Sequence, residues 1–384
     1  MSAQPARREN LKLPRNRGLP EGISLLRKFS ARVKPGTLNL GLGKPEVDMP
    51  DSIRALAKTS LLDSKLDYTE NAGDASIRNL LASQLAISSG KQIILSHGAQ
   101  EALMAALVAT LSPGDEVLIP DPGFLSYAPI IKTLGGKAVP YRLRKQSGAY
   151  VHDLLEIKKK LSTRTRAIIV SSPGNPTGCD LAPEEVRALL TLIDKKRIVI
   201  LSDEVYGMLH FTRTYQPLAC LDERIVSLNS FSKSHALTGW RIGFIACENV
   251  KLLQSCLIAH QYIATCASVP SQRLLGLLLS SALFKRIPSD YRVQYQSKLD
   301  LFRSESGETM RMKITLACGG FYLFPELPKK QKSMEFCEQL LDQQDVLTIP
   351  GSAFGKQGEG SIRLSLALPD KQIVKAAKLL SLYY

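Results

Sequence analysis

The chain has 384 residues, of which 44% are hydrophobic and 22% are charged, which indicates a globular protein with a large domain and a smaller one. Lysine and arginine number 50 and aspartate and glutamate 35, giving a formal net charge of +15. The basic residues are spread along the chain without a nucleic-acid-binding motif, so we interpret the charge as a basic surface and expect no nucleic-acid or membrane partner.

Targeting and cysteine patterns point to the cytoplasm. No apolar run is long enough to cross a bilayer, and the N-terminus lacks the apolar core of a signal peptide. The 7 cysteines are scattered without a Cys-x-x-Cys pair, which argues against a disulfide framework and a zinc site. We therefore expect free thiols, no metal and a cytoplasmic location.

Residues 1–35 carry nine basic residues, two glutamates and four prolines. This composition predicts an extended arm and not a stable helix. An organelle-targeting segment is the alternative interpretation, which the prolines and glutamates weaken.

From residue 93 to residue 230, strand and helical patterns alternate, and a helical pattern over 51–61 precedes them. Apolar residues at helical spacing predict helices over 51–61, 101–111 and 183–195. Apolar runs predict strands over 93–96, 116–119, 166–171, 197–202 and 224–228. The 166–171 run shows little alternation, as in a strand of a parallel sheet covered on both faces. Because strands alternate with helices, we predict an α/β fold with a mostly parallel sheet.

Two junctions after predicted strands favour ligand binding. Gly98, Ala99 and Gln100 form a turn that opens a helix, and free backbone N–H groups at such a turn form an anion site. Asp203 comes directly after the 197–202 strand, and an acid at the carboxyl end of a parallel strand faces the ligand crevice.

A lone lysine, Lys233, follows the 224–228 strand and a small polar turn. An amine that is partly desolvated there has a lowered pKa and attacks carbonyl groups. Ser230, Ser232 and Arg241 carry groups that suit phosphate oxygens. This combination suggests a carbonyl-bearing phosphate ligand, namely pyridoxal phosphate, although the residues alone also allow a solvated lysine and a surface arginine.

The pattern changes after about residue 288. Before it, a strand is predicted over 239–246 and helices over 250–264 and 271–284. After it, strands are predicted over 319–324, 346–349 and 361–365, and helices over 291–304 and 370–382. We predict a large domain over 46–287 and a small α+β domain over 288–384, joined by a linker near 285–290. Residues 1–45 would form an N-terminal arm and the start of the small domain.

Several motifs in this order resemble those of the class I/II aminotransferases, which are fold-type I pyridoxal-phosphate enzymes. They are Ser230-Phe231-Ser232-Lys233 with Gly239-Trp240-Arg241, Asn175-Pro176-Thr177-Gly178, and Asp203-Glu204-Val205-Tyr206. The resemblance extends from about residue 40 to residue 367. It implies a fold-type I transferase, with a mostly parallel central sheet flanked by helices and a smaller α+β domain.

The resemblance assigns most site residues to the cofactor. Lys233 would hold pyridoxal phosphate covalently, Asp203 would pair with its ring nitrogen, and Phe124 would stack on its ring. Asn175 and Tyr206 would bond its phenolic oxygen. The residues implied around the phosphate are Gly98, Ala99, Gln100, Ser230, Ser232 and Arg241.

The resemblance assigns the remaining site residues to the substrate and to a partner subunit. Gly43 would meet the substrate carboxylate through its backbone, and Arg363 would grip the α-carboxylate beside Asn175. Lys44 stands where the family usually has an acid, which changes the charge at the mouth of the site. Tyr68 resembles a tyrosine that reaches the phosphate of the neighbouring subunit, so a homodimer is implied.

The implied reaction moves an amino group between an L-amino acid and a 2-oxo acid in ping-pong order, with Lys233 as general base and acid. A pyridoxal-phosphate-dependent C–S lyase on the same fold is the alternative, and a non-catalytic regulator is a weaker one. Ala99 replaces a lysine that binds acidic side chains in some aspartate aminotransferases. This predicts a neutral donor, unless Lys44 or another basic residue compensates.

Overall fold

The computed structural model describes residues 23–41, 43–45, 49–62, 66–194, 196–307, 312–328 and 331–382. The predicted arm lies outside these residues up to residue 22. Beyond it the prediction was wrong, because α1 (Leu25–Ser30) is a helix. The Ser24 side chain accepts the Arg27 backbone N–H as an N-cap, and Phe29 is buried, which together stabilise this turn.

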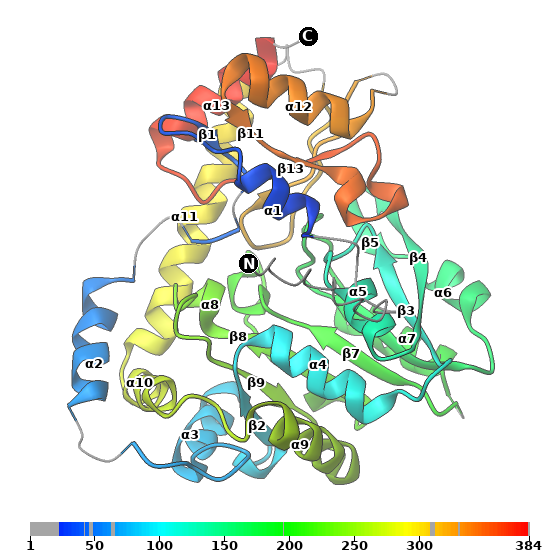
Figure 1. Cartoon of the computed structure of the whole chain (residues 1–384), viewed down its shortest axis with the longest axis vertical. Helices are drawn as coiled ribbons and strands as arrows, with labels where there is room; N and C mark the ends of the chain where they lie inside the picture. Colours follow the sequence, from blue (N-terminus) through cyan, green and yellow to red (C-terminus); the bar gives the residue numbers. More distant parts are fainter. Residues whose placement is uncertain are drawn as a thin grey trace, which may run out of the picture.

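The described residues contain an eight-stranded sheet at the centre of the molecule (Figure 1). Its strands, in spatial order, are β2 (Ile93–Ser96), β9 (Gly243–Ala246), β8 (Ile225–Ser230), β7 (Val199–Asp203), β6 (Thr165–Ser171), β3 (Glu116–Asp121), β4 (Lys137–Gln146) and β5 (Ala149–His152). The five from β8 to β4 run parallel, whereas β9 is antiparallel to both its neighbours and β5 is antiparallel to β4. The prediction of a mostly parallel sheet is confirmed.

Helices cover both faces of this sheet. They are α2 (Asp51–Leu61), α3 (Ala75–Leu85), α4 (Ala99–Thr110), α5 (Tyr127–Thr133), α6 (Leu154–Lys160), α7 (Pro183–Leu192), α8 (Phe231–Ser234), α9 (Val250–Ala264) and α10 (Val269–Leu279). Alternate side chains of β6 show the layering, since Ile169 packs in one cluster with Leu103 of α4. Ile168 packs in another with Leu189 of α7, as the two-residue period of a strand requires.

The predicted 239–246 strand begins only at Gly243. Arg241 has a φ of +51°, a left-handed conformation that no extended strand contains. The preceding residues therefore form a turn, and this turn places Arg241 beside the start of α4.

A second departure is the predicted linker, because residues 285–290 lie inside α11 (Leu283–Ser306). Phe284, Ile287 and Tyr291 are buried at helical spacing, which holds the helix together through Pro288. Proline lacks the N–H that would bond the carbonyl four residues earlier. That carbonyl, of Phe284, lies 3.0 Å from His235 Nε2 instead.

The C-terminal part is smaller and carries its own strands. In the described residues, β10 (Tyr322–Leu323), β13 (Ile362–Ser365) and β12 (Ile349–Pro350) form an antiparallel sheet. β1 (Leu38–Asn39) pairs in parallel with β11 (Val346–Leu347), so the N-terminal segment lies beside this part. Helices α12 (Ser333–Gln344) and α13 (Asp370–Leu382) complete it. The exact domain boundaries stay a prediction.

Short 3₁₀ helices lie in the connections, at Gly90–Gln92, Gly207–Leu209, Leu218–Leu221, Gly351–Phe354 and Lys356–Gly358. Among the described residues, we find no helix with both the length and the apolar character needed to cross a membrane.

Candidate active site

A cavity of about 390 Å³ lies at the carboxyl ends of β6, β7 and β8. It gathers every site residue predicted from the sequence except Gly98 and Tyr68. Those that line it are Gly43, Ala99, Gln100, Phe124, Asn175, Asp203, Tyr206, Ser230, Ser232, Lys233, Arg241 and Arg363. The prediction from separate motifs thus corresponds to one place in the fold.

Lys233 lies in the short helix α8, which Ser230 caps by accepting the Ser232 N–H. Its Nζ donates to the backbone oxygen of Gly43 at 2.5 Å. Burial, and then the positive charges of Arg363 and Arg241, lower the pKa of Lys233 to about 8. Near neutral pH about a tenth of this amine is therefore uncharged, far more than for an ordinary lysine, and the uncharged form is the nucleophile.

The start of α4 forms an anion cradle with Arg241. Gly98 is the N-cap of α4, with a φ of +79° and no side-chain cap, so first-turn N–H groups point toward the cavity. A Cβ at Gly98 would lie 2.8 Å from Arg241 Nη2, which explains the glycine. Arg241 also contacts Ser232 Oγ at 3.4 Å and the His97 carbonyl at 3.3 Å.

Asp203 is held by Tyr127, a residue to which sequence analysis gave no role. The Tyr127 hydroxyl donates to Asp203 Oδ2 at 2.5 Å, and the Val205 N–H reaches Oδ1 at 3.3 Å. Burial raises the pKa of Asp203, and these two hydrogen bonds oppose the rise. Tyr127 also meets the Phe124 ring edge-on at 5.6 Å. The spacing of Tyr127, three residues after Phe124, was the sequence signal that could have pointed to it.

Arg363 is a buried cation with an unsatisfied donor. Its side chain is 1% exposed, and it donates to Gly41 O at 2.6 Å and Asn175 Oδ1 at 3.1 Å. Its guanidinium carbon lies 4.3 Å from the Tyr322 ring centre. Among the described residues, Arg363 Nε has no hydrogen-bond partner and no carboxylate pairs with the group. A buried guanidinium in this state suits a carboxylate ligand.

Tyr322 lines the cavity and was not predicted. Its hydroxyl occupies the space beside Gly43, where a Cβ would come within 1.8 Å of it. Tyr206 packs edge-on against Tyr322 at 5.7 Å, and burial raises the pKa of Tyr206 well above its ordinary value. The Tyr206 hydroxyl therefore stays protonated and able to donate a hydrogen bond.

Tyr68 does not line this cavity, and 85% of its side chain is exposed. The role that the resemblance implies for it needs a second copy of the chain. The cavity of a single chain neither supports nor contradicts that role.

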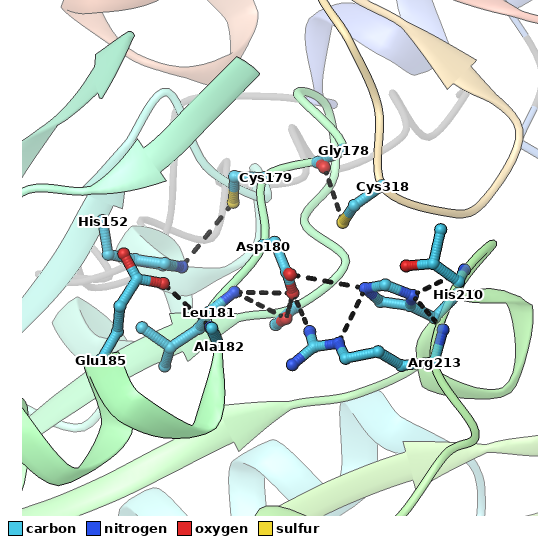
Figure 2. A network of polar contacts seen from close by, with 12 residues as sticks. His152, Gly178, Cys179, Asp180, Leu181, Ala182, Glu185, His210, Arg213 and Cys318 are labelled. Carbon is cyan, nitrogen blue, oxygen red and sulfur yellow. Dashed lines mark hydrogen bonds and ion pairs between the residues drawn. The ribbon is translucent and has the colours of Figure 1, made fainter. Parts of the chain in front are cut away.

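A polar network links three segments, 178–182, 210–213 and the loop around Cys318 (Figure 2). Asp180 accepts a hydrogen bond from Arg213 and lies 3.4 Å from His210 Nε2. The possible ligand atoms of Asp180, His210 and Cys318 lie within 4.8 Å of one another. However, Arg213 already neutralises Asp180, and the other ring nitrogen of His210 accepts two backbone N–H groups. We interpret the network as a structural ion pair.

The aminotransferase class I and II family model matches residues 35–380. The chain belongs to this family. It is 32% identical to a probable N-acetyl-LL-diaminopimelate aminotransferase of Bacillus subtilis, over 90% of this chain and 89% of that protein. It is also 32% identical to an aspartate aminotransferase of Pyrococcus horikoshii, over 88% of each chain. The solved aromatic aminotransferase from Pyrococcus horikoshii OT3 superposes with a TM-score of 0.84 at 31% identity, over 93% and 97% of the chains.

Family membership confirms the predicted fold type I, the aminotransferase activity and the dependence on pyridoxal phosphate. The protein is thus an enzyme that moves an amino group between amino acids and 2-oxo acids. The residues present fit the cofactor: Lys233 has a lowered pKa, Gly98 leaves room for Arg241 beside the anion cradle, and Asp203 stands at the end of β7.

Proposed function

We propose that this cavity carries out transamination between an L-amino acid and a 2-oxo acid in ping-pong order, with Lys233 as the catalytic residue. The observation that carries the proposal is the lowered pKa of the buried Lys233 amine. A general base is most efficient when its pKa lies near the working pH. An ordinary surface lysine, with a pKa near 10.5, would be almost fully charged.

The residues that would hold the cofactor surround Lys233. Arg241, Ser230, Ser232 and the start of α4 (98–100) suit its phosphate. Asp203, oriented by Tyr127, would pair with its ring nitrogen, and Phe124 would pack against the ring. Asn175 and Tyr206 would donate to its phenolic oxygen. When bound, the cofactor supplies an electron sink for the charge that develops at the substrate Cα.

The chain's own residues then position the substrate and move one proton. Arg363 binds the α-carboxylate with its planar fork, with Asn175 and the backbone of Gly43 beside it. This fixes the Cα–H bond toward Lys233. The uncharged Lys233 amine takes the proton from Cα and returns it to the cofactor-side carbon.

We further propose that the enzyme works as a homodimer in the cytoplasm. Tyr68 and Tyr262 are 85% and 83% exposed, and a hydrogen bond from Asn71 to the Thr265 carbonyl, at 2.8 Å, joins their two segments. Exposed aromatic side chains on neighbouring segments suit a contact with a second copy. In that dimer, Tyr68 of one copy would reach the phosphate site of the other.

The test is chemical labelling of the resting holoenzyme. Borohydride reduction followed by peptide mapping should mark Lys233, and a mark on another lysine would contradict the assignment. In a parallel assay, a new amino acid should form in equal amount to the 2-oxo acid released. Ammonia release without any acceptor would favour the C–S lyase alternative instead.

A further inference from the structure

A buried acid lies in the first turn of α4, next to the anion cradle. The side chain of Glu101 is 10% exposed, and its Oε2 accepts the backbone N–H of His97 at 3.1 Å. Its Oε1 lies 3.0 Å from Nδ1 of His260. An ionised carboxylate only accepts hydrogen bonds, so this ring nitrogen is the donor. Neither Glu101 nor His260 lines the cavity, and the proposed function gives them no role.

His260 comes from α9, which packs beside α4 (Figure 1). Its side chain is fully buried. Among the described residues, its Nε2 atom has no hydrogen-bond partner. Burying a polar ring with one unpaired nitrogen costs free energy. The contact with Glu101 is therefore the interaction that fixes the orientation of this ring.

The backbone of His97 connects this pair to the anion cradle. Its N–H is bonded to Glu101, and its carbonyl accepts Nη2 of Arg241 at 3.3 Å. The next residue, Gly98, is the N-cap of α4 and has no side-chain cap. Because glycine leaves its own backbone unrestricted, contacts made by its neighbours must hold this turn. Glu101 and Arg241 supply such contacts at the N–H and at the carbonyl of His97.

We propose that His260 and Glu101 are positioning residues for the cofactor phosphate. His260 orients Glu101, and Glu101 fixes the backbone of His97. That backbone in turn fixes Arg241 and the start of α4. The inference rests on the proposed function, which assigns the phosphate to this cradle.

The charge of Glu101 makes its orientation important. A carboxylate turned toward the cradle would compete with the phosphate for the free N–H groups of α4 and would repel it. His260 holds the carboxylate on the side of α9, where it accepts the His97 N–H instead. Loss of His260 would thus loosen the turn and also release an anion beside the phosphate site.

The experiment compares pyridoxal phosphate with pyridoxal, which has the same ring and aldehyde but lacks the phosphate. Each is added to the whole chain, and its dissociation constant is measured from the change in absorbance. The constant for pyridoxal divided by that for pyridoxal phosphate is the phosphate preference. Glu101→Ala and His260→Leu should each lower it by about tenfold, because each removes a hydrogen bond to a charged group. The double variant should lower it little further, because both residues act through one series of contacts.

Two further variants separate this role from packing. In His260→Asn the amide nitrogen stands near the position of Nδ1 and also donates, so the phosphate preference should stay within about threefold of the wild-type value. Cys256→Ala is the matched control, because Cys256 is buried on α9 one helical turn before His260. It should lower the melting temperature and leave the phosphate preference unchanged.

An unchanged phosphate preference in folded Glu101→Ala or His260→Leu protein would overturn the inference. An equal loss of affinity for both ligands would do the same, because a contact that only joins α4 to α9 would act in that way. Thermal melts identify a variant that does not fold, and the other variant then decides. Failure of the proposed function looks different, since Arg241→Gln would then leave the phosphate preference unchanged, whereas an intact assignment requires it to fall.

Discussion

Replacing Tyr127 with phenylalanine removes one hydroxyl group and keeps the buried ring. The hydroxyl donates to Asp203 Oδ2 at 2.5 Å, and this hydrogen bond lowers the pKa of Asp203 against the effect of burial. Without it the pKa of Asp203 rises further. A carboxyl group that is more often neutral is a poorer partner for a protonated ring nitrogen, so both cofactor affinity and kcat should fall.

The magnitude follows from the chemistry of this contact. A hydrogen bond to a charged group contributes about 1.5–3 kcal/mol, and about 1.36 kcal/mol corresponds to a factor of ten in rate. The Val205 N–H still reaches the other carboxylate oxygen, at 3.3 Å. We therefore expect kcat to fall by roughly tenfold to a hundredfold, without complete loss of activity.

The assay is the pH profile of kcat, together with the cofactor dissociation constant. In Tyr127→Phe the acid limb of the profile should move to higher pH, because Asp203 becomes protonated more readily. Tyr141→Phe is the control: Tyr141 is also buried, but its hydroxyl bonds to the Ile169 carbonyl and to His152. An unchanged acid limb with an unchanged kcat in Tyr127→Phe, or equal effects in both variants, would refute the reasoning.

Three further predictions concern the catalytic amine, a buried acid and the assembly. Lys233→Ala should abolish turnover while the cofactor still binds, as measured by steady-state rates and equilibrium dialysis; residual wild-type activity would contradict the assigned role. Burial raises the pKa of Glu204 from 4.5 to about 7, so the folded state favours the protonated acid. Stability should fall as pH rises from about 4.5 to about 7, and thermal melts of Glu204→Gln should lose this fall; a variant that keeps it would contradict the assignment. Mixing Tyr68→Phe with Lys233→Ala protein should restore partial activity through hybrid dimers, whereas fully active monomers in solution would exclude the shared site.

The sequence motifs could name residues that lie together in one cavity because each motif is local. Lys233, Asp203 and Asn175 each belong to a short segment whose residues suggest their chemistry without knowledge of the fold. Arg363 was less evident on its own and depended on the family resemblance. The sheet followed from apolar runs in β3, β6, β7 and β8. Of these, β3 and β8 are buried from end to end, and β6 and β7 are buried in their middle residues.

The residues that were missed depend on contacts between distant segments. Arg27 and Tyr322 reach the cavity from α1 and β10, and no local pattern marks either of them. β4 and β5 were not predicted, because β4 places exposed charged residues between buried ones and reads as a polar segment. The linker prediction near 285–290 failed because buried side chains on both sides of Pro288 continue the helix through it.

Pro288 also connects the catalytic amine to the C-terminal part of the chain. The carbonyl that it leaves free, on Phe284, accepts the Nε2–H of His235, which lies two residues after Lys233. Burial lowers the pKa of His235 to about 4, so this link does not titrate under ordinary conditions. Because α11 packs against both α10 and α13, a rotation of the C-terminal part would bend the helix where it has one backbone hydrogen bond fewer. Such a bend would change the position of the Phe284 carbonyl, and through His235 it would reach the short helix α8 that carries Lys233.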